Sequence, residues 1–145
     1  MINIPTIIAL LTLLLFSSAF GSNLEKELKL ANEGNMSSQL RLAHAYRFGK
    51  SVDQDYDKSL SWYHKSALQG QYIAQGDLGY MYSVGEGIEK NLIQAYAWIS
   101  ASIKNGPENW KASMLIKKEK ISNKLSQQDL ESAELLAIEY SNLTN

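Results

Sequence analysis

The sequence predicts an all-α fold, an α/α superhelical solenoid of about seven helices. Residues 35–70 and 71–106 are two copies of one 36-residue unit. No proline occurs between residues 22 and 106, and the helix-favouring residues Leu, Ala, Lys, Glu and Gln are frequent there. Tandem units of this length are the signature of solenoids, in which each unit buries its apolar face against the next one.

The two copies share seven identical positions, against roughly two that ordinary residue usage gives by chance. The identical pairs are Gln39 and Gln75, Leu42 and Leu78, Tyr46 and Tyr82, Gly49 and Gly85, Trp62 and Trp98, Ser66 and Ser102, and Gly70 and Gly106. We predict that Trp62 and Trp98 are wedges between paired helices, because solenoid units bury faces only against their neighbours. Stacking of the indole rings on a bound ligand is the alternative.

Capping residues and glycines place the helix boundaries. Asp55 and Asn91 are good N-caps at equivalent positions, and the predicted helices cover residues 24–33, 36–48, 56–69, 72–84 and 92–105. Gly87, in the turn of the second copy, is expected to have a positive φ. Beyond Pro107, two more helices are predicted from apolar residues at helical spacing. The longer helix carries Trp110, Met114, Ile121 and Leu125, and the last helix carries Leu130, Ala133, Leu136 and Tyr140.

Residues 1–21 have the features of a secretory signal peptide. An apolar run, Ile4–Phe16, is followed by small residues that include Ala19 and Gly21. We expect export to the periplasm or beyond, with cleavage before Ser22. Cleavage would leave a repeat domain over residues 22–145, of which residues 107–145 form a C-terminal helical cap. An uncleaved membrane anchor is the alternative.

Composition argues against several classes of function. The formal net charge is −1, with 14 basic and 15 acidic residues, so no basic footprint for nucleic acid is present. The absence of Cys excludes disulfides and thiolate catalysis. His44 and His64 are the only histidines, and Ser100 has no base that the sequence places beside it. No catalytic residue, metal site or cofactor is therefore predicted.

The second copy resembles the Sel1-like repeat, a relative of the tetratricopeptide repeat. Eleven positions carry the resemblance: Ala74, Leu78, Gly79, Tyr82, Gly85, Gly87, Ile88, Asn91, Ala95, Trp98 and Gly106. The first copy departs from the pattern, with Ala43 in place of one glycine and Ser51 in place of another. The resemblance spans residues 24–106. It implies an α/α superhelix that holds other proteins together, often in the bacterial envelope or during interaction with a host.

By this resemblance, the expected function is that of a non-enzymatic protein–protein interaction module or adaptor, exported to the cell envelope or beyond. Its protein partner is not identified by the sequence. One alternative is an envelope factor that binds a small ligand or glycan in the concave groove. Another is a structural or immunity-type protein with a single dedicated partner.

A binding face is predicted from helical periodicity. Arg41, His44 and Phe48 fall on a stripe roughly 125° from the predicted core side of their helix, and Asp77 and Tyr80 occupy the equivalent stripe one unit later. In related solenoids the first helix of each unit lines the concave side, so these five residues form the candidate contact surface. A solvated face without a partner is the alternative.

Charge and size differ between the equivalent positions of this stripe, while the core positions match. A surface of this kind tolerates change, because surface substitutions usually alter stability by about 0.5 kcal/mol or less. We therefore expect that replacing Arg41, His44, Asp77 and Tyr80 together with alanine changes stability by less than about 1 kcal/mol.

Overall fold

The computed structural model describes residues 23–143, and all regular structure in that range is helical. A helix over residues 23–32 comes first. It is followed by α2 (Met36–Phe48), α3 (Tyr56–Leu68), α4 (Tyr72–Val84), α5 (Leu92–Asn105), α6 (Glu108–Ser122) and α7 (Gln127–Asn142). The predicted all-α architecture is confirmed, with seven helices and no strand in residues 23–143. The predicted signal peptide lies outside the described residues.

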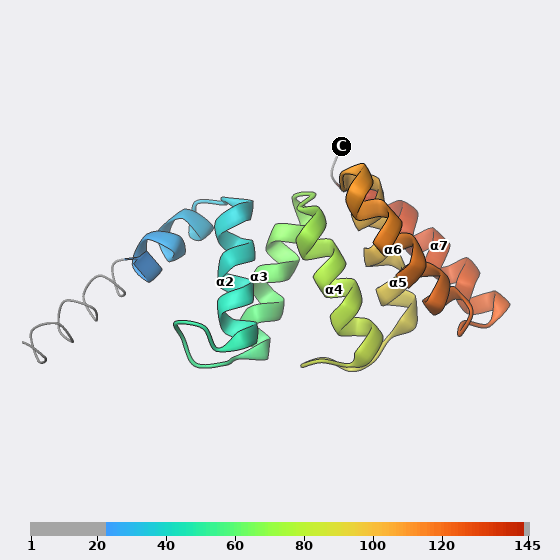
Figure 1. Cartoon of the computed structure of the whole chain (residues 1–145), viewed down its shortest axis with the longest axis horizontal. Coiled ribbons are helices and arrows are strands. Elements are labelled where there is room, and N and C mark those ends of the chain that lie inside the picture. The colour runs from blue at the N-terminus through green and yellow to red at the C-terminus, as the bar shows by residue number, and fades with distance from the viewer. Residues whose placement is uncertain (1–22, 144–145) are drawn as a thin grey trace, which may run out of the picture.

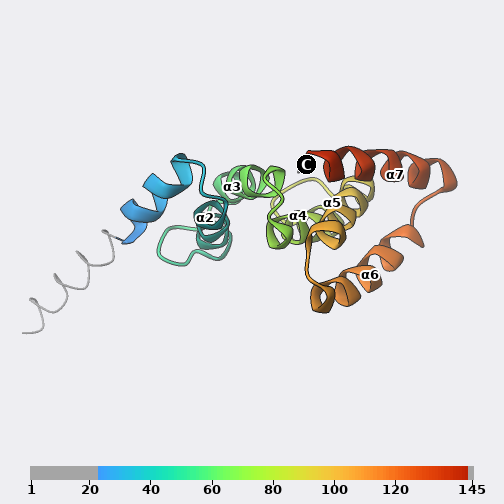
Figure 2. The same ribbon diagram turned by 90° about the horizontal axis from the view of Figure 1, so that it is seen from above.

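The helices follow one another along the long axis of the molecule (Figure 1). Viewed from above, α2, α4 and α6 lie along one side of this row, and α3, α5 and α7 lie along the other (Figure 2). Each 36-residue unit therefore contributes one helix to each side. At the C-terminal end, α6 and α7 both pack on α5 but diverge from one another.

The helix boundaries follow the predicted capping residues. Asp55 accepts a hydrogen bond from the backbone N–H of Lys58, and Asn91 accepts one from Gln94. Gly85 closes α4 with a φ of 79°, in the left-handed region that glycine adopts without strain. One boundary was wrong: Leu125 lies beyond α6, because a tight turn ends that helix at Ser122 before Ser126 caps α7.

The two repeated tryptophans have different environments. Trp98 is buried, and its ring stacks on Tyr140 of α7 with a centroid separation of 4.0 Å. Trp62 packs on the edge of the core and remains half-buried, with the Lys65 ammonium 4.1 Å from its ring centroid. The wedge prediction is therefore confirmed for Trp98 and only partly for Trp62, because α7 packs on α5 and not on α3.

A ladder of buried amide hydrogen bonds explains why Gln39 and Gln75 are repeated. The Gln39 side-chain amide donates to the Ala31 carbonyl at 3.0 Å, and Gln75 donates to the Ala67 carbonyl at 3.0 Å, one unit later. Each glutamine oxygen in turn accepts a bond from the second helix of its own unit, from Gln69 and Asn105 respectively. Each glutamine thus joins three helices through a fully satisfied buried amide.

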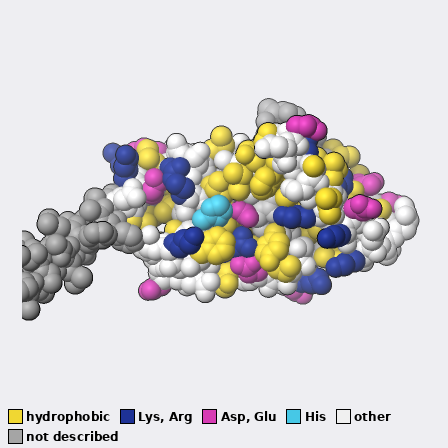
Figure 3. All heavy atoms as spheres, in the orientation of Figure 1, with side chains coloured by type: hydrophobic (Ala, Val, Ile, Leu, Met, Phe, Trp, Pro, Cys, Tyr) yellow, Lys and Arg dark blue, Asp and Glu magenta, His cyan; other side chains and the backbone are white. Residues whose placement is uncertain are grey.

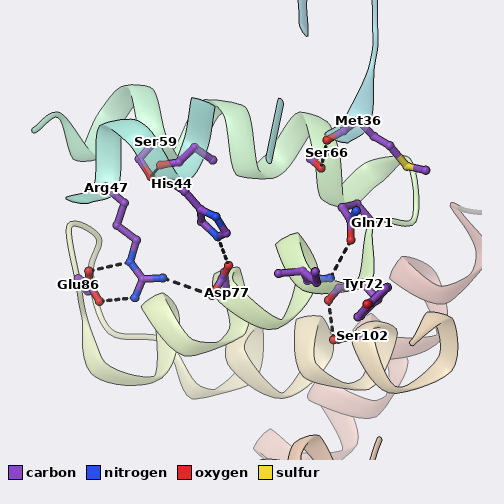
Figure 4. A network of polar contacts seen from close by, with 12 residues as sticks. Met36, His44, Arg47, Ser59, Ser66, Gln71, Tyr72, Asp77, Glu86 and Ser102 are labelled. Atoms are coloured by element: carbon purple, nitrogen blue, oxygen red, sulfur yellow. Dashed lines mark hydrogen bonds and ion pairs between the residues drawn. The ribbon is translucent and has the colours of Figure 1, made fainter. Parts of the chain in front are cut away.

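Two serine hydroxyls repeat in the same way. Ser66 donates to the Met36 carbonyl at 2.8 Å, and Ser102 donates to the Tyr72 carbonyl at 2.7 Å (Figure 4). Ser102 also accepts a bond from the indole N–H of Trp110. These bonds give both serine hydroxyls an acceptor in the first turn of α2 and α4 and fix the second helix of each unit against the first.

We expect Gly87→Val to lower stability by about 2–4 kcal/mol and Ser51→Val by about 1 kcal/mol. Both positions have a positive φ, 68° at Gly87 and 77° at Ser51, so backbone strain alone does not separate them. The difference arises because a Cβ at Gly87 would lie 2.5 Å from the Cβ of Tyr56. Denaturant melts of the two variants test this; equal losses of stability would contradict a role for the Tyr56 contact.

Candidate functional site

A buried arginine joins the first helices of the two repeats. Arg47 of α2 is 6% exposed. Its guanidinium donates two hydrogen bonds to Glu86, at 2.8 and 2.7 Å, and a third to Asp77 of α4 at 3.3 Å (Figure 4). The paired bonds to one carboxylate give the strong, geometrically specific form of an Arg–carboxylate contact. This ion pair connects α2 to α4 and to the turn that follows α4.

The electrostatics favour the charged forms of both partners. Burial alone would lower the pKa of Arg47, but the hydrogen bonds to Glu86 raise it overall. The same hydrogen bonds lower the pKa of the Glu86 carboxyl below its ordinary value. The pair therefore stays ionised through the physiological pH range.

Four of the five predicted contact residues surround this ion pair. His44 Nε2 lies 2.8 Å from Asp77 Oδ2. The rings of Phe48 and Tyr80 flank the Arg47 guanidinium, with centroids 5.0 and 5.2 Å from its central carbon. The aromatic rings therefore shield the guanidinium from water, and they also offer it favourable cation–π contacts.

The fifth predicted residue lies apart from the others. Arg41 is exposed and pairs with Glu27 of the preceding helix, at 2.8 Å. The polar members of the predicted stripe are thus occupied in contacts within the chain. Consequently the ion pair argues against the expectation that four alanines change stability by less than about 1 kcal/mol, because removing Asp77 takes a partner from a buried cation.

Arg47 was missed by the sequence reading for two reasons. Its counterpart in the second repeat is Ser83, so the comparison of the two repeats did not mark Arg47 as a repeated position. Its partners lie 30 and 39 residues away along the chain, beyond the reach of helical periodicity. The available signal was Glu86, an acidic residue fixed between the two turn glycines Gly85 and Gly87.

An open groove lies beside this cluster, between α4 and α6. Leu92 and Ile99 of α5 contribute to its lining, and Tyr80 and Val84 line it on the α4 side. Lys117, Lys120, Ile121 and Lys124 line it on the α6 side, and Ser83 completes the lining. The groove has a volume of about 260 Å³. Hydrophobic and basic side chains gather on this face of the molecule (Figure 3).

Ser100 and His64, the residues considered as candidates for catalysis or metal binding, are not brought together in one site. The Ser100 hydroxyl is buried and has no hydrogen-bond partner. His64 packs edge-on against Trp98 of the next repeat rather than beside Trp62, and burial lowers its pKa. No cluster of metal-binding side chains occurs within residues 23–143. In the same range, no helix combines the length and apolar character that crossing a bilayer requires.

The family assignment rests on the repeats. The model of the Sel1 repeat matches residues 37–71 and again residues 73–107. The chain contains two Sel1 repeats. The matched ranges agree with the predicted units 35–70 and 71–106 to within two residues, and the resemblance read from the sequence is confirmed. The Sel1 repeats coincide with α2–α3 and α4–α5, so they carry the Arg47 ion pair and one wall of the groove.

Two solved structures share the fold of these Sel1 repeats. One is a protective antigen of uropathogenic Escherichia coli, with 30% identity, a TM-score of 0.76 and 83% of this chain covered. This chain spans only 25% of that protein. The other is a Sel1 repeat protein from Oxalobacter formigenes, with 20% identity, a TM-score of 0.56 and 77% and 97% of the two chains covered. None of the curated proteins matches the sequence.

Proposed function

We propose that this protein is a non-enzymatic, exported interaction module that holds a partner protein on the face formed by α2, α4 and α6. Sel1 repeats generally mediate protein–protein interactions. The observation that carries the proposal is a strip of large side chains on consecutive first helices. Phe48, Tyr80 and Val84 are 51%, 41% and 53% exposed, and aromatic side chains are enriched where proteins bind each other.

The shape of this face favours a protein over a small ligand. The groove between α4 and α6 has a volume of about 260 Å³. Small-molecule pockets commonly enclose roughly 300–1,000 Å³ and bury most of the ligand. A shallow, elongated surface with an apolar strip suits a polypeptide segment better. Binding of a glycan or small ligand remains the alternative outcome of the experiment below.

Export rests on the signal-peptide features of residues 1–21 and on the envelope role that the repeat family implies. An interaction module without a catalytic centre is consistent with such a location, since its activity requires only a partner and a stable surface. The proposal assigns no enzymatic step to Ser100 or to either histidine.

Site-specific photo-crosslinking tests the proposed face. A photoreactive phenylalanine analogue at Tyr80 should give protein adducts in cells that naturally produce the protein. The control is Leu68, which is 45% exposed and belongs to α3, a helix on the other side of the row. Adducts at position 80 and none at position 68 are expected. Adducts at position 68 alone would contradict the proposed face, and a small-molecule adduct at position 80 would favour the alternative.

A further inference from the structure

The groove between α4 and α6 carries an unbalanced positive charge. Three of its lining residues, Lys117, Lys120 and Lys124, are exposed lysines, and none of the lining residues is acidic. None of the three lysines takes part in an ion pair within residues 23–143. Glu86, in the turn after α4, is already paired with Arg47. The groove therefore presents cations without counter-charges.

The three lysines lie along one wall of the groove. Lys117 and Lys120 are three residues apart and so lie on one side of α6. Lys124, in the turn after that helix, lines the same groove. Ile121 lies between them and is buried at the base of this wall. Lys120 lies in the last turn of α6, where a cation also stabilises the helix end. Lys117 precedes that turn and Lys124 follows the helix, so helix-end stabilisation does not account for all three.

The opposite wall and the floor are apolar. Tyr80 and Val84 project from α4, and Leu92 and Ile99 close the floor from α5. Hence a ligand in this groove would meet hydrophobic surface on one side and a row of ammonium groups on the other. A segment with the complementary pattern has carboxylates along one edge and large apolar side chains along the other.

We infer that the groove between α4 and α6 binds an acidic, amphipathic segment of the partner protein, with its apolar side chains seated against Val84 and Leu92 and its carboxylates on the three lysines. The inference rests on the proposed function and specifies the chemistry of the partner. It also moves the main contact away from the predicted stripe, whose polar residues Arg41, His44 and Asp77 are engaged within the chain.

Peptide binding to the full chain tests the inference directly. The probe is a short synthetic peptide of glutamates with two leucines at helical spacing, labelled with a fluorophore. Fluorescence polarisation should show binding that weakens as salt is added. Amide chemical shifts should change at the residues that line the groove. A peptide with lysines in place of the glutamates should not bind. An all-glutamate peptide should bind at least about tenfold more weakly, because it lacks apolar anchors.

Matched triple variants locate the contact. The Lys117→Gln, Lys120→Gln, Lys124→Gln chain should bind the acidic peptide about tenfold more weakly, since three charge pairs are lost. The control chain carries Lys26→Gln, Lys29→Gln and Lys65→Gln, which remove the same charge from exposed positions outside the groove. Equal weakening in both chains, shifts confined to other surfaces, or equal binding of the all-glutamate peptide would overturn the inference.

The two proposals fail in different ways. If the native chain gives no protein adduct at position 80, the proposed face is wrong, and the lack of a protein adduct at both positions contradicts the interaction function itself. If the adduct forms and persists undiminished in the groove variant, the function stands and the acidic-segment inference is wrong. Loss of that adduct in the groove variant, with retention in the control chain, supports both.

Discussion

Replacement of Trp98 by alanine should lower the free energy of unfolding by about 3–5 kcal/mol, the range for truncating a fully buried tryptophan. The loss is expected at the high end because the ring belongs to the core cluster shared by the two repeats and also stacks on Tyr140 of α7. Removing it therefore leaves a cavity at a junction between the repeat and the C-terminal helix. Chemical denaturation followed by far-ultraviolet circular dichroism measures the change.

The equivalent change in the first repeat is the matched control. Trp62→Ala should cost about 1–2 kcal/mol, because only part of the side chain leaves an apolar environment. The same ring is removed from equivalent positions of the two repeats, so the difference between the two losses of stability reports the extra burial of Trp98, to which Tyr140 of α7 contributes. Equal losses for the two variants would show that the stacking on Tyr140 contributes nothing measurable.

Replacement of Arg47 by alanine should lower the free energy of unfolding by about 3 kcal/mol, the lower end of the range for breaking a buried ion pair. The lower end applies because the side chains of its partners, Asp77 and Glu86, are about a quarter exposed. Arg41→Ala in the same helix is the control: Arg41 is exposed, its pair with Glu27 lies at the surface, and its loss should cost about 0–1 kcal/mol. Similar losses would contradict the structural role of Arg47.

Acid provides a second measurement on this pair. The hydrogen bonds from Arg47 lower the pKa of Glu86 in the folded chain, so between the folded and unfolded pKa values the unfolded chain binds more protons. The pair therefore stabilises the fold above the ordinary glutamate pKa of 4.5, and this stabilisation is lost as pH falls below that value. The Arg47→Ala chain should lose less stability than the native chain over that acid range. An identical decline would contradict the linkage.

Much of the fold was predictable because the same helix-capping and helix-ending residues occur at equivalent positions of both repeats. The capping residues Asp55 and Asn91 and the closing glycines mark helix ends locally, within a few residues of sequence. Periodicity identifies the buried side of the helices only in part: Leu42 of α2 is buried as predicted, but Ala43 and Arg47 of the same helix are buried as well. The divergence of α6 and α7 was not predictable, because it depends on how two helices outside the repeat pack against α5.

The candidate site was less accessible to sequence reasoning. His44, Phe48, Asp77 and Tyr80 were placed on one face by helical geometry, and the structure does bring them together. Their common neighbour is Arg47, which helical geometry placed elsewhere and whose counterpart in the second repeat is Ser83 and not a basic residue. The groove was missed for a related reason: its lysine wall belongs to α6, and no repeat relates α6 to α4.

The amide ladder has a consequence for how such a chain can change in length. Each glutamine of a unit bonds to a main-chain carbonyl of the helix before it, and any residue type supplies that acceptor. Its oxygen is bonded from within its own unit, by Gln69 or Asn105. For this bond, a unit therefore supplies its own donor and requires from the preceding unit only a main-chain carbonyl. Duplication of residues 71–106 would insert a copy that keeps this bond to the helix before it, so this contact of the junction is retained when the number of units changes.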